Sequence, residues 1–102
     1  MRLPFEEKAA QELEAVAQFY ERERAGYGRL FLAEASKKVS RAADFPQSGA
    51  CVAETQPERD VRAFVLSKFP YTVVTAIVTG RRAVIAVAHQ HRRPGYWKNR
   101  VK

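Results

Sequence analysis

The sequence has no acidic residue after Asp60. The segment from Val61 to Lys102 contains nine lysine and arginine side chains and no carboxylate side chain, so its formal charge is +9. The first 60 residues hold the other nine basic side chains and all eleven acidic ones, which leaves them at −2. The +7 of the whole chain is therefore concentrated in one half. A chain polarised in this way usually binds an anionic partner, such as nucleic acid, a membrane surface or an acidic protein.

The same pattern has a plainer explanation, in which the basic side chains only keep one face of the protein solvated. We favour a binding role because the basic half is also the most apolar and strand-like part of the chain. Basic side chains on a folded sheet are held in a defined arrangement, whereas basic side chains that only keep a surface solvated do not need to lie on a sheet.

Cysteine is nearly absent, because Cys51 is the only one. A single cysteine excludes an intrachain disulfide and fits the reducing cytosol. No stretch approaches the roughly 20 apolar residues of a membrane-spanning helix, and no apolar run follows the first residues, so we expect neither a membrane contact nor a signal peptide. We predict a cytoplasmic protein with one domain, residues 1–102, since this length supports a single modest core.

Two helices are expected in the first half of the chain. In residues 6–24, and again in residues 29–43, apolar side chains recur every three or four positions, as on one face of an amphipathic helix. Gly26 lies between them, where glycine ends a helix without strain. The short connection predicts an antiparallel helical hairpin. The two apolar stripes consist of Ala9, Leu13, Val16 and Tyr20, and of Phe31, Ala35, Val39 and Ala42.

The second half has the pattern of β-strands. Residues 61–67 alternate, residues 71–79 are rich in β-branched side chains, and residues 83–89 are apolar on both faces, as in a central strand. Residues 51–54 and 2–5 are weaker strand candidates. We expect a tight turn at Gly80-Arg81 or Arg81-Arg82, and a basic tail over residues 90–102. The fold class predicted is α+β, with the N-terminal antiparallel helical hairpin packed on a small, mostly antiparallel β-sheet.

Groups capable of phosphate chemistry gather at the end of the last predicted strand. His89 and His91 could transfer protons at neutral pH, Arg92 could bind phosphate oxygens through two nitrogens, and Tyr96 and Trp97 could stack on unpaired bases. A metal-free ribonuclease could be built from such groups. A two-metal nuclease could not be built from this half of the chain alone, which has no carboxylate side chain to hold Mg²⁺.

Each of these groups also has a structural explanation. A histidine that ends an apolar strand, such as His89, is more often hydrogen-bonded to backbone than catalytic. His89 and His91 share a strand face but lack an evident third ligand, so we expect no metal site. The two aromatic residues that follow could equally pack the tail onto the sheet. Arg62 could face a phosphate groove or pair with Glu54 across the sheet.

Several short motifs follow one another along nearly the whole chain. They are the run Leu3-Pro4-Phe5-Glu6-Glu7-Lys8-Ala9-Ala10-Gln11-Glu12-Leu13 followed by Phe19-Tyr20, the corner Gly26-Tyr27-Gly28-Arg29-Leu30-Phe31, then Val61-Arg62, Phe69-Pro70-Tyr71, and Val84-Ile85-Ala86-Val87-Ala88-His89 with Arg92, Pro94 and Trp97. No single motif is specific, but the ordered set resembles the RelE/ParE superfamily of bacterial toxins.

This resemblance implies the toxin of a type II toxin–antitoxin pair. Such a toxin is neutralised by a small antitoxin whose acidic, extended C-terminal segment wraps around it, and it reaches operator DNA only through that antitoxin. The acidic partner agrees with the polarised charge of the chain. The resemblance implies no cofactor. We expect the inhibitor groove to involve the helical stripes and the sheet face beside them.

The superfamily divides by target. RelE-like members cut messenger RNA on the ribosome with a metal-free set of basic residues and often a C-terminal tyrosine, which Tyr96 matches. Those members carry an arginine early in the strand after the mid-sheet loop, and the corresponding position here is near Thr72, which is not basic. Their paired lysines have no clear match, since that region offers only Arg62 and Lys68. Their second catalytic arginine corresponds to a position near Gln90, with Arg92 two positions further on. ParE-like members poison DNA gyrase and carry no nuclease set. We favour the ParE-like branch; a degenerate member that retains only antitoxin binding and operator regulation is a weaker third hypothesis.

Candidate site residues follow from these two branches. In a ribonuclease, Arg62 and Arg92 would contact the scissile phosphate, His89 or His91 would transfer a proton, and Tyr96 would stack on or position the RNA. In a gyrase inhibitor the same segment would be a binding surface. The candidates for contact with the target or the antitoxin are Arg81, Arg82, His91, Arg93, Trp97, Lys98 and Arg100.

Overall fold

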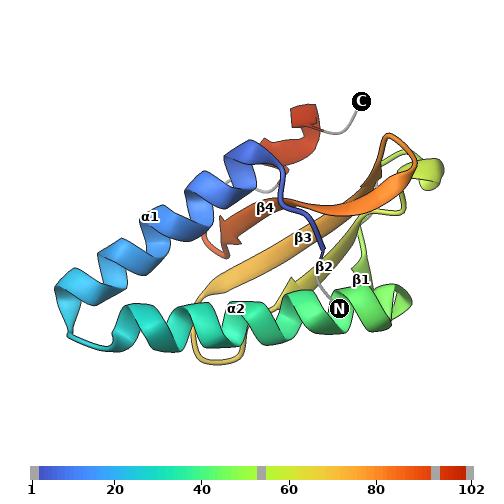
Figure 1. Cartoon of the computed structure of the whole chain (residues 1–102). Coiled ribbons are helices and arrows are strands. Elements are labelled where there is room, and N and C mark those ends of the chain that lie inside the picture. The colour runs from blue at the N-terminus through green and yellow to red at the C-terminus, as the bar shows by residue number, and fades with distance from the viewer. Residues whose placement is uncertain (1–2, 53–54, 93–94, 101–102) are drawn as a thin grey trace.

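The computed structural model describes residues 3–52, 55–92 and 95–100, and it confirms the predicted α+β fold. Two helices, α1 (Glu7–Glu23) and α2 (Tyr27–Asp44), pack as an antiparallel hairpin on one face of a four-stranded antiparallel sheet (Figure 1). Both helices begin and end within two residues of the predicted ranges. Among the described residues, no helix is long and apolar enough to cross a membrane.

The corner between the helices depends on two glycines. Gly26 has a φ of +92°, a left-handed conformation that favours glycine. A Cβ atom at Gly28 would lie 2.6 Å from the backbone oxygen of Ala17, so only glycine lets the two helices approach so closely. The Glu21 carboxylate accepts hydrogen bonds from the N–H groups of Gly26 and Gly28, at 3.0 and 3.1 Å. The Gly-Tyr-Gly corner is therefore a packing requirement of the hairpin.

The strands follow one another in space as they do in sequence. They are β1 (Ala50–Cys51), β2 (Arg62–Val65), β3 (Tyr71–Val78) and β4 (Arg81–His89), in the order β1-β2-β3-β4. The first of them is shorter than the predicted strand at 51–54, of which residues 53 and 54 lie outside the described residues. The candidate strand at 2–5 is reduced, within the described residues, to one parallel bridge from Phe5 to Val84.

The turn between β3 and β4 lies earlier than predicted. Its two central residues are Thr79 and Gly80, with φ angles of 48° and 82°, while Arg81 and Arg82 already belong to β4. Positive φ at both central positions is typical of a type I′ hairpin turn, whose twist matches that of the flanking strands. The prediction failed because threonine rarely adopts this conformation.

The prediction that the last strand lies in the centre of the sheet was wrong, because β4 is the last strand in the sheet order. Part of its outer edge is covered by the segment before α1. The Val84 N–H donates to Pro4 O, and the Glu6 N–H donates to Val84 O, each at 2.9 Å. The strand is apolar on both sides because each sheet face carries a hydrophobic core, not because a further strand flanks it.

A β-bulge decides which side chains of β4 face which core. Val74 pairs with Ala86 and Thr75 with Val84, which leaves Ile85 without a partner in β3. A bulge inserts one residue and so shifts the alternation of the strand by one position. The core on the helix side contains Val73, Val84 and Val87 of these strands, and the core on the other side contains Val74, Ile85, Ala86 and Ala88.

The second core is closed by the C-terminal segment, which was expected to be a basic tail. Residues Tyr96–Arg100 form a short 3₁₀-helix, η3, and its Trp97 is only 6% exposed. Trp97 packs in the same cluster as Val61 and Ile85. Of the two explanations for the C-terminal aromatic residues, packing onto the sheet therefore applies to Trp97.

The Glu12 carboxylate fastens this segment to α1 and β4. It accepts hydrogen bonds from the Val87 N–H at 3.0 Å, from the Tyr96 hydroxyl at 2.7 Å and from both terminal nitrogens of Arg100 at 3.0 Å. Arg100 also donates to Ile85 O at 2.9 Å. Burial raises the pKa of Glu12, but the hydrogen bonds from Arg100, Val87 and Tyr96 outweigh it, so the pKa is lowered. We call these four groups, with Val87 contributing its N–H, the Glu12 clamp.

The first prediction concerns this clamp. Glu12→Gln keeps the size of the side chain but removes the charge that Arg100 neutralises, so we expect the free energy of unfolding to fall by about 2 kcal/mol. The matched control, Glu14→Gln, lies on the exposed side of α1 and should change it by less than about 0.5 kcal/mol. Urea unfolding at pH 7 measures both. Equal losses in the two variants would contradict the clamp.

Candidate functional site

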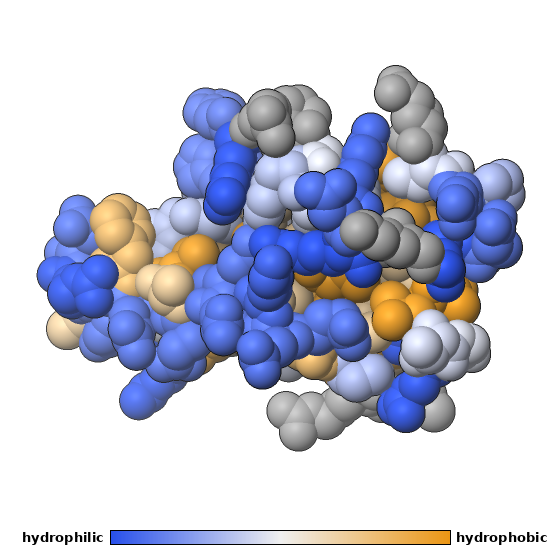
Figure 2. Space-filling view, turned by 90° about the horizontal axis from the view of Figure 1, so that it is seen from above, coloured by the Kyte–Doolittle hydropathy of each residue, from blue (hydrophilic) through white to orange (hydrophobic). Residues whose placement is uncertain are grey.

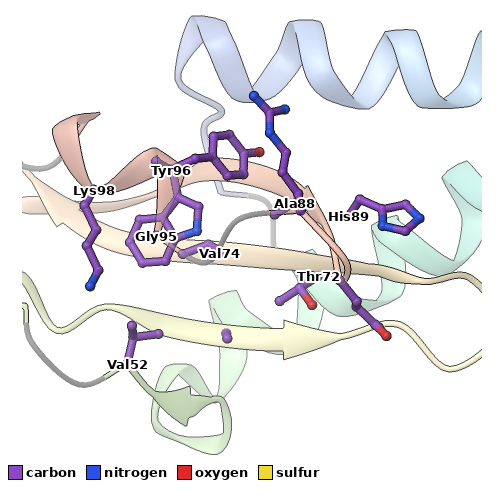
Figure 3. Close-up of a pocket in the computed structure, with 12 residues that line it drawn as sticks. Val52, Thr72, Val74, Ala88, His89, Gly95, Tyr96 and Lys98 are labelled. Carbon is purple, nitrogen blue, oxygen red and sulfur yellow. The ribbon is translucent and has the colours of Figure 1, made fainter.

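A pocket of about 240 Å³ lies on the sheet face opposite the helices, beside η3 (Figure 3). Its lining includes small or apolar residues of the three longer strands and of the segment after β1: Val52, Ala63, Thr72, Val74 and Ala88. Larger polar and aromatic side chains stand at its C-terminal side, including Arg92, Tyr96 and Lys98. The pocket therefore brings together five of the predicted candidates, which are His89, Arg92, Tyr96, Trp97 and Lys98.

The two histidines lie at the end of β4. As Figure 3 shows, the His89 imidazole points away from Tyr96 and Gly95, although the residue borders the pocket. Its ring packs edge-on against Tyr71 at 5.0 Å, and its Nδ1 accepts a hydrogen bond from the His91 N–H at 3.0 Å. One ring nitrogen of His89 therefore already accepts a backbone hydrogen bond. This arrangement agrees better with a structural histidine than with a general base in this pocket.

Tyr96 borders the pocket, but its hydroxyl belongs to the Glu12 clamp. Burial and the hydrogen bond to Glu12 raise the pKa of Tyr96 to about 12, so the phenol stays protonated at neutral pH. The Arg92 guanidinium lies 3.8 Å from the centre of the Tyr96 ring, within the range of a cation–π interaction. The Tyr96 ring can therefore hold Arg92 in place, while the Tyr96 hydroxyl donates its hydrogen bond to Glu12.

Arg62 and Arg82 meet at a second carboxylate, that of Asp60. Arg62 donates to Asp60 Oδ1 at 3.0 Å and to Gly49 O at 3.1 Å. Arg82 donates to Asp60 Oδ2 at 2.5 Å and to Thr75 Oγ1 at 2.9 Å. The predicted alternatives for Arg62 were a phosphate groove or Glu54, which lies outside the described residues; its carboxylate partner in the structure is Asp60.

The four residues proposed for a ribonuclease do not form one cluster. Arg62 pairs across the sheet with Thr75 in the middle of β3, whereas His89 pairs with Tyr71, the first residue of that strand. Four positions along a strand span about 13 Å. Arg92 and Tyr96 lie with the His89 end, so Arg62 is the member that the fold sets apart.

The remaining candidates are distributed over the basic half. Arg81 and His91 are exposed, and Lys98 is exposed at the pocket. Arg100 is half-buried in its ion pair with Glu12. Arg93 lies outside the described residues. The face seen from above is mainly hydrophilic, with smaller hydrophobic areas between the polar side chains (Figure 2).

Most residues of the helical stripes are buried, but Leu13, Ala35 and Val39 also line a groove of about 390 Å³ between the two helices. Ala9, Phe31, Ala35, Val39 and Ala42 are all buried in the structure. The inhibitor groove expected on these stripes and on the sheet face beside them therefore stays a prediction. The large apolar side chains that are exposed are Phe19, Leu30, Leu32, Phe45 and Val65, of which Leu32 lines this groove.

Sequence reasoning missed the two carboxylates that organise the basic side chains. A signal existed for Asp60, since it is the last acidic residue before a half of the chain that carries only cations. Glu12 had no comparable signal, because its partners Tyr96 and Arg100 lie 84 and 88 positions away.

Together these features define a small, basic α+β protein in which carboxylates hold several cations in place and leave others exposed around a shallow pocket. The model of the ParE toxin of the type II toxin–antitoxin system parDE matches residues 3–94, and the chain belongs to this family. The match confirms the resemblance to the RelE/ParE superfamily and to its ParE-like branch. Family membership makes the chain a type II toxin and implies an antitoxin partner.

A solved structure supports the same fold. The structure of a chromosomal ParDE toxin–antitoxin system from P. aeruginosa matches with a TM-score of 0.69. The match covers 87% of this chain and 95% of that chain, at 18% sequence identity, so it shows a shared fold. No curated protein matches the chain.

The second prediction concerns acid stability. Burial raises the pKa of Asp60, but its hydrogen bonds with Gln47 and Arg62, and the charges of Arg62 and Arg82, lower it below the ordinary 3.8. A carboxyl group with a lowered folded pKa stabilises the fold above its ordinary pKa, and this stabilisation is lost as the pH falls through the lowered value.

We therefore expect Asp60→Asn to destabilise the protein by about 2 kcal/mol at pH 7, and by less as the pH approaches 2. Urea unfolding across this pH range measures the difference from the wild type. Asp44→Asn, at an exposed helix end, is the control and should show little pH-dependent difference. A loss for Asp60→Asn that stays constant down to pH 2 would contradict the ion-pair assignment.

Proposed function

We propose that this chain inhibits DNA gyrase, as a binding protein without bond chemistry of its own, and that an acidic antitoxin neutralises it. The observation that carries the proposal is the placement of the groups a ribonuclease would use. The Tyr96 hydroxyl donates to Glu12, and Arg62 is held by Asp60 beside the middle of β3. The His89 ring points away from Tyr96.

The exposed cations support a binding role. Arg81, Arg92 and Lys98 are exposed on a folded scaffold. The structure describes no ion pair for these three side chains within residues 3–52, 55–92 and 95–100. Unpaired positive charge attracts anionic surfaces over about 8–10 Å at physiological salt. Gyrase engaged on DNA offers such a surface.

A ribosome-dependent ribonuclease is the second candidate, and one observation favours it. Arg92 lies over the Tyr96 ring at the pocket, where a phosphate could be bound beside a platform for a base. In this case Arg92 would bind the scissile phosphate, and His91, which is exposed next to it, would have to transfer the proton.

The third prediction tests gyrase directly. Purified toxin, gyrase and supercoiled plasmid should accumulate cleaved DNA–gyrase complexes in the presence of ATP. The double variant Arg92→Glu/Lys98→Glu should need at least about tenfold more protein for the same cleavage, because it reverses two exposed charges beside the pocket. Lys8→Glu/Arg22→Glu makes the same charge change on α1 and serves as the control. Cleavage that never rises above background with active wild-type toxin would exclude the gyrase proposal.

The fourth prediction separates the two functions. Tyr96→Phe removes only the hydroxyl group, at a cost of about 1 kcal/mol for its hydrogen bond to Glu12. A gyrase inhibitor should keep its growth inhibition within about twofold at matched protein levels. Tyr27→Phe removes another tyrosine hydroxyl, far from the pocket in sequence, and serves as the control. A large loss of growth inhibition for folded Tyr96→Phe alone would favour the ribonuclease.

A further inference from the structure

One exposed cation at the pocket beside η3 is held in place by an aromatic ring and not by a carboxylate. The Arg92 N–H donates to His89 O at 3.0 Å, in the turn that ends β4. The Arg92 guanidinium lies over the Tyr96 ring, 3.8 Å from its centre. The side chain is exposed, and no ion pair within residues 3–52, 55–92 and 95–100 involves it. The charge of Arg92 is therefore oriented and still available to a partner.

Lys98, the other basic side chain that lines this pocket, has no comparable support. Its side chain lies across Gly95, where a Cβ atom would come within 2.7 Å of Lys98 Cε. In Figure 3 it stands apart from the Tyr96 ring. Among the described residues, neither a carboxylate nor an aromatic ring holds its ammonium group, and lysine carries its charge on a flexible stem. Arg92 is thus the oriented cation of the pocket, and Lys98 is the flexible one.

The Tyr96 ring is itself fixed at its far end by the Glu12 clamp. The Tyr96 hydroxyl donates to Glu12 Oε2 at 2.7 Å. Glu12 is held in turn by Arg100, at 3.0 Å, and by the Val87 N–H, at 3.0 Å. A ring that is held both at its Cα and at its hydroxyl has little freedom to tilt. The clamp therefore determines the orientation of the surface on which Arg92 rests.

The two arginines beside the Tyr96 ring have different roles. Arg100 lies 5.2 Å from the centre of the ring and is half-buried. Its terminal nitrogens donate to Glu12 and to Ile85 O, so they are used within the fold. The Arg92 guanidinium makes no such hydrogen bond among the described residues, and no core residue packs around it. A purely structural role therefore accounts for Arg100 but leaves the placement of Arg92 unexplained.

We propose that Tyr96 and Glu12 are positioning residues for Arg92, and that the oriented Arg92 guanidinium contacts an anionic group of the toxin's target. The Tyr96 ring would act on Arg92 directly, and Glu12 would act through the ring. This inference rests on the proposed function in so far as gyrase engaged on DNA is taken to be the target. It assigns a role in target binding to Glu12, a residue of α1 that lies outside the pocket.

Preorganisation is the physical reason why this arrangement strengthens binding. A free arginine side chain loses rotamer freedom when it binds a partner, and that loss opposes binding. Arg92 has lost part of this freedom before the target arrives, because the ring already holds its guanidinium. The planar group can rest one face on the ring while the N–H groups at its edge donate to two oxygens of one anion. An ammonium group has no such planar edge, so lysine could not replace arginine at this position.

A double-mutant cycle on the full-length toxin tests the proposal. The measured quantity is the toxin concentration that gives half-maximal cleaved DNA–gyrase complex. We expect Arg92→Ala to raise it at least about tenfold and Tyr96→Leu to raise it about fivefold. In the Arg92→Ala background, Tyr96→Leu should add less than about twofold, because the ring then has no guanidinium to position. A merely structural loss at Tyr96 would be the same in both backgrounds.

Three further variants make the cycle specific. Tyr96→Phe and Tyr96→Leu both lack the hydroxyl, so the difference between them measures the ring alone. Arg92→Lys keeps the charge but not the planar group, and we expect it to need about fivefold more toxin. The control is Tyr27→Leu, because the Tyr27 ring lies under another arginine, Arg24, at 5.1 Å and does not line the pocket. It should stay within about twofold of the wild type.

NMR of the toxin alone measures the positioning without any target. Protons that lie over an aromatic ring resonate upfield of their ordinary positions. We expect the Cδ and Nε protons of Arg92 to be shifted upfield in the wild type and in Tyr96→Phe. The shift should disappear in Tyr96→Leu and decrease in Glu12→Gln, where the ring loses its charged partner. The Arg24 signals, over the Tyr27 ring, should not change in these variants.

Three results would overturn the proposal. Equal effects of Tyr96→Leu with and without Arg92 would show that the ring acts independently of this arginine. Ordinary Arg92 chemical shifts in the wild type would show that the ring does not hold the guanidinium. Full activity of Arg92→Lys would show that only the charge matters and not its orientation.

Growth inhibition separates this result from the function proposal. The same cycle is repeated in cells that lack the antitoxin, at matched protein levels, and this readout assumes no particular target. Coupling between Arg92 and Tyr96 in growth inhibition, without cleaved gyrase complexes, would overturn the function proposal alone. Cleaved complexes that form without this coupling would overturn the positioning proposal alone.

Discussion

The Glu12 carboxylate joins three segments that are distant in sequence: α1, the outer edge of β4 and the C-terminal η3. Its charge is offset by Arg100 and by hydrogen bonds from Val87 and Tyr96, so burial does not leave it without partners. Without it, backbone groups on the outer edge of β4 would lose their partners, and such edges attract other strands. The closed second core, with Trp97 inside it, depends on this interaction because η3 is held there by it.

The same interaction shapes the functional surface. The Tyr96 hydroxyl and the Arg100 guanidinium are hydrogen-bonded to Glu12 and so stabilise the fold. The Tyr96 ring remains available to pack against Arg92. Asp60 acts in the same way on Arg62 and Arg82 at the other end of the sheet. The basic half of the chain therefore contains two kinds of cation, those that hold the fold together and those that remain exposed for a partner. This division fits a toxin that acts by binding.

Much of the fold could be predicted from the sequence, because periodicity is a local property. The spacing of Phe31, Ala35 and Val39 placed α2, and the β-branched run after Tyr71 placed β3. The pattern could not place β4 at the edge, since a strand covered on both faces has the same composition as a central one. Nor could it find the clamp, because nothing near Glu12 in the sequence marks a partner 84 positions away.

The most direct test of the central claim, that this toxin acts on gyrase and not on messenger RNA, is pulse labelling in cells that lack the antitoxin. Incorporation of labelled thymidine and of a labelled amino acid is followed over the first minutes after induction of the chain. Our account predicts that DNA synthesis stops first, with DNA-damage signalling induced. Protein synthesis that stops first while thymidine incorporation continues would contradict it and make the segment from His89 to Tyr96 the candidate active site of a ribonuclease.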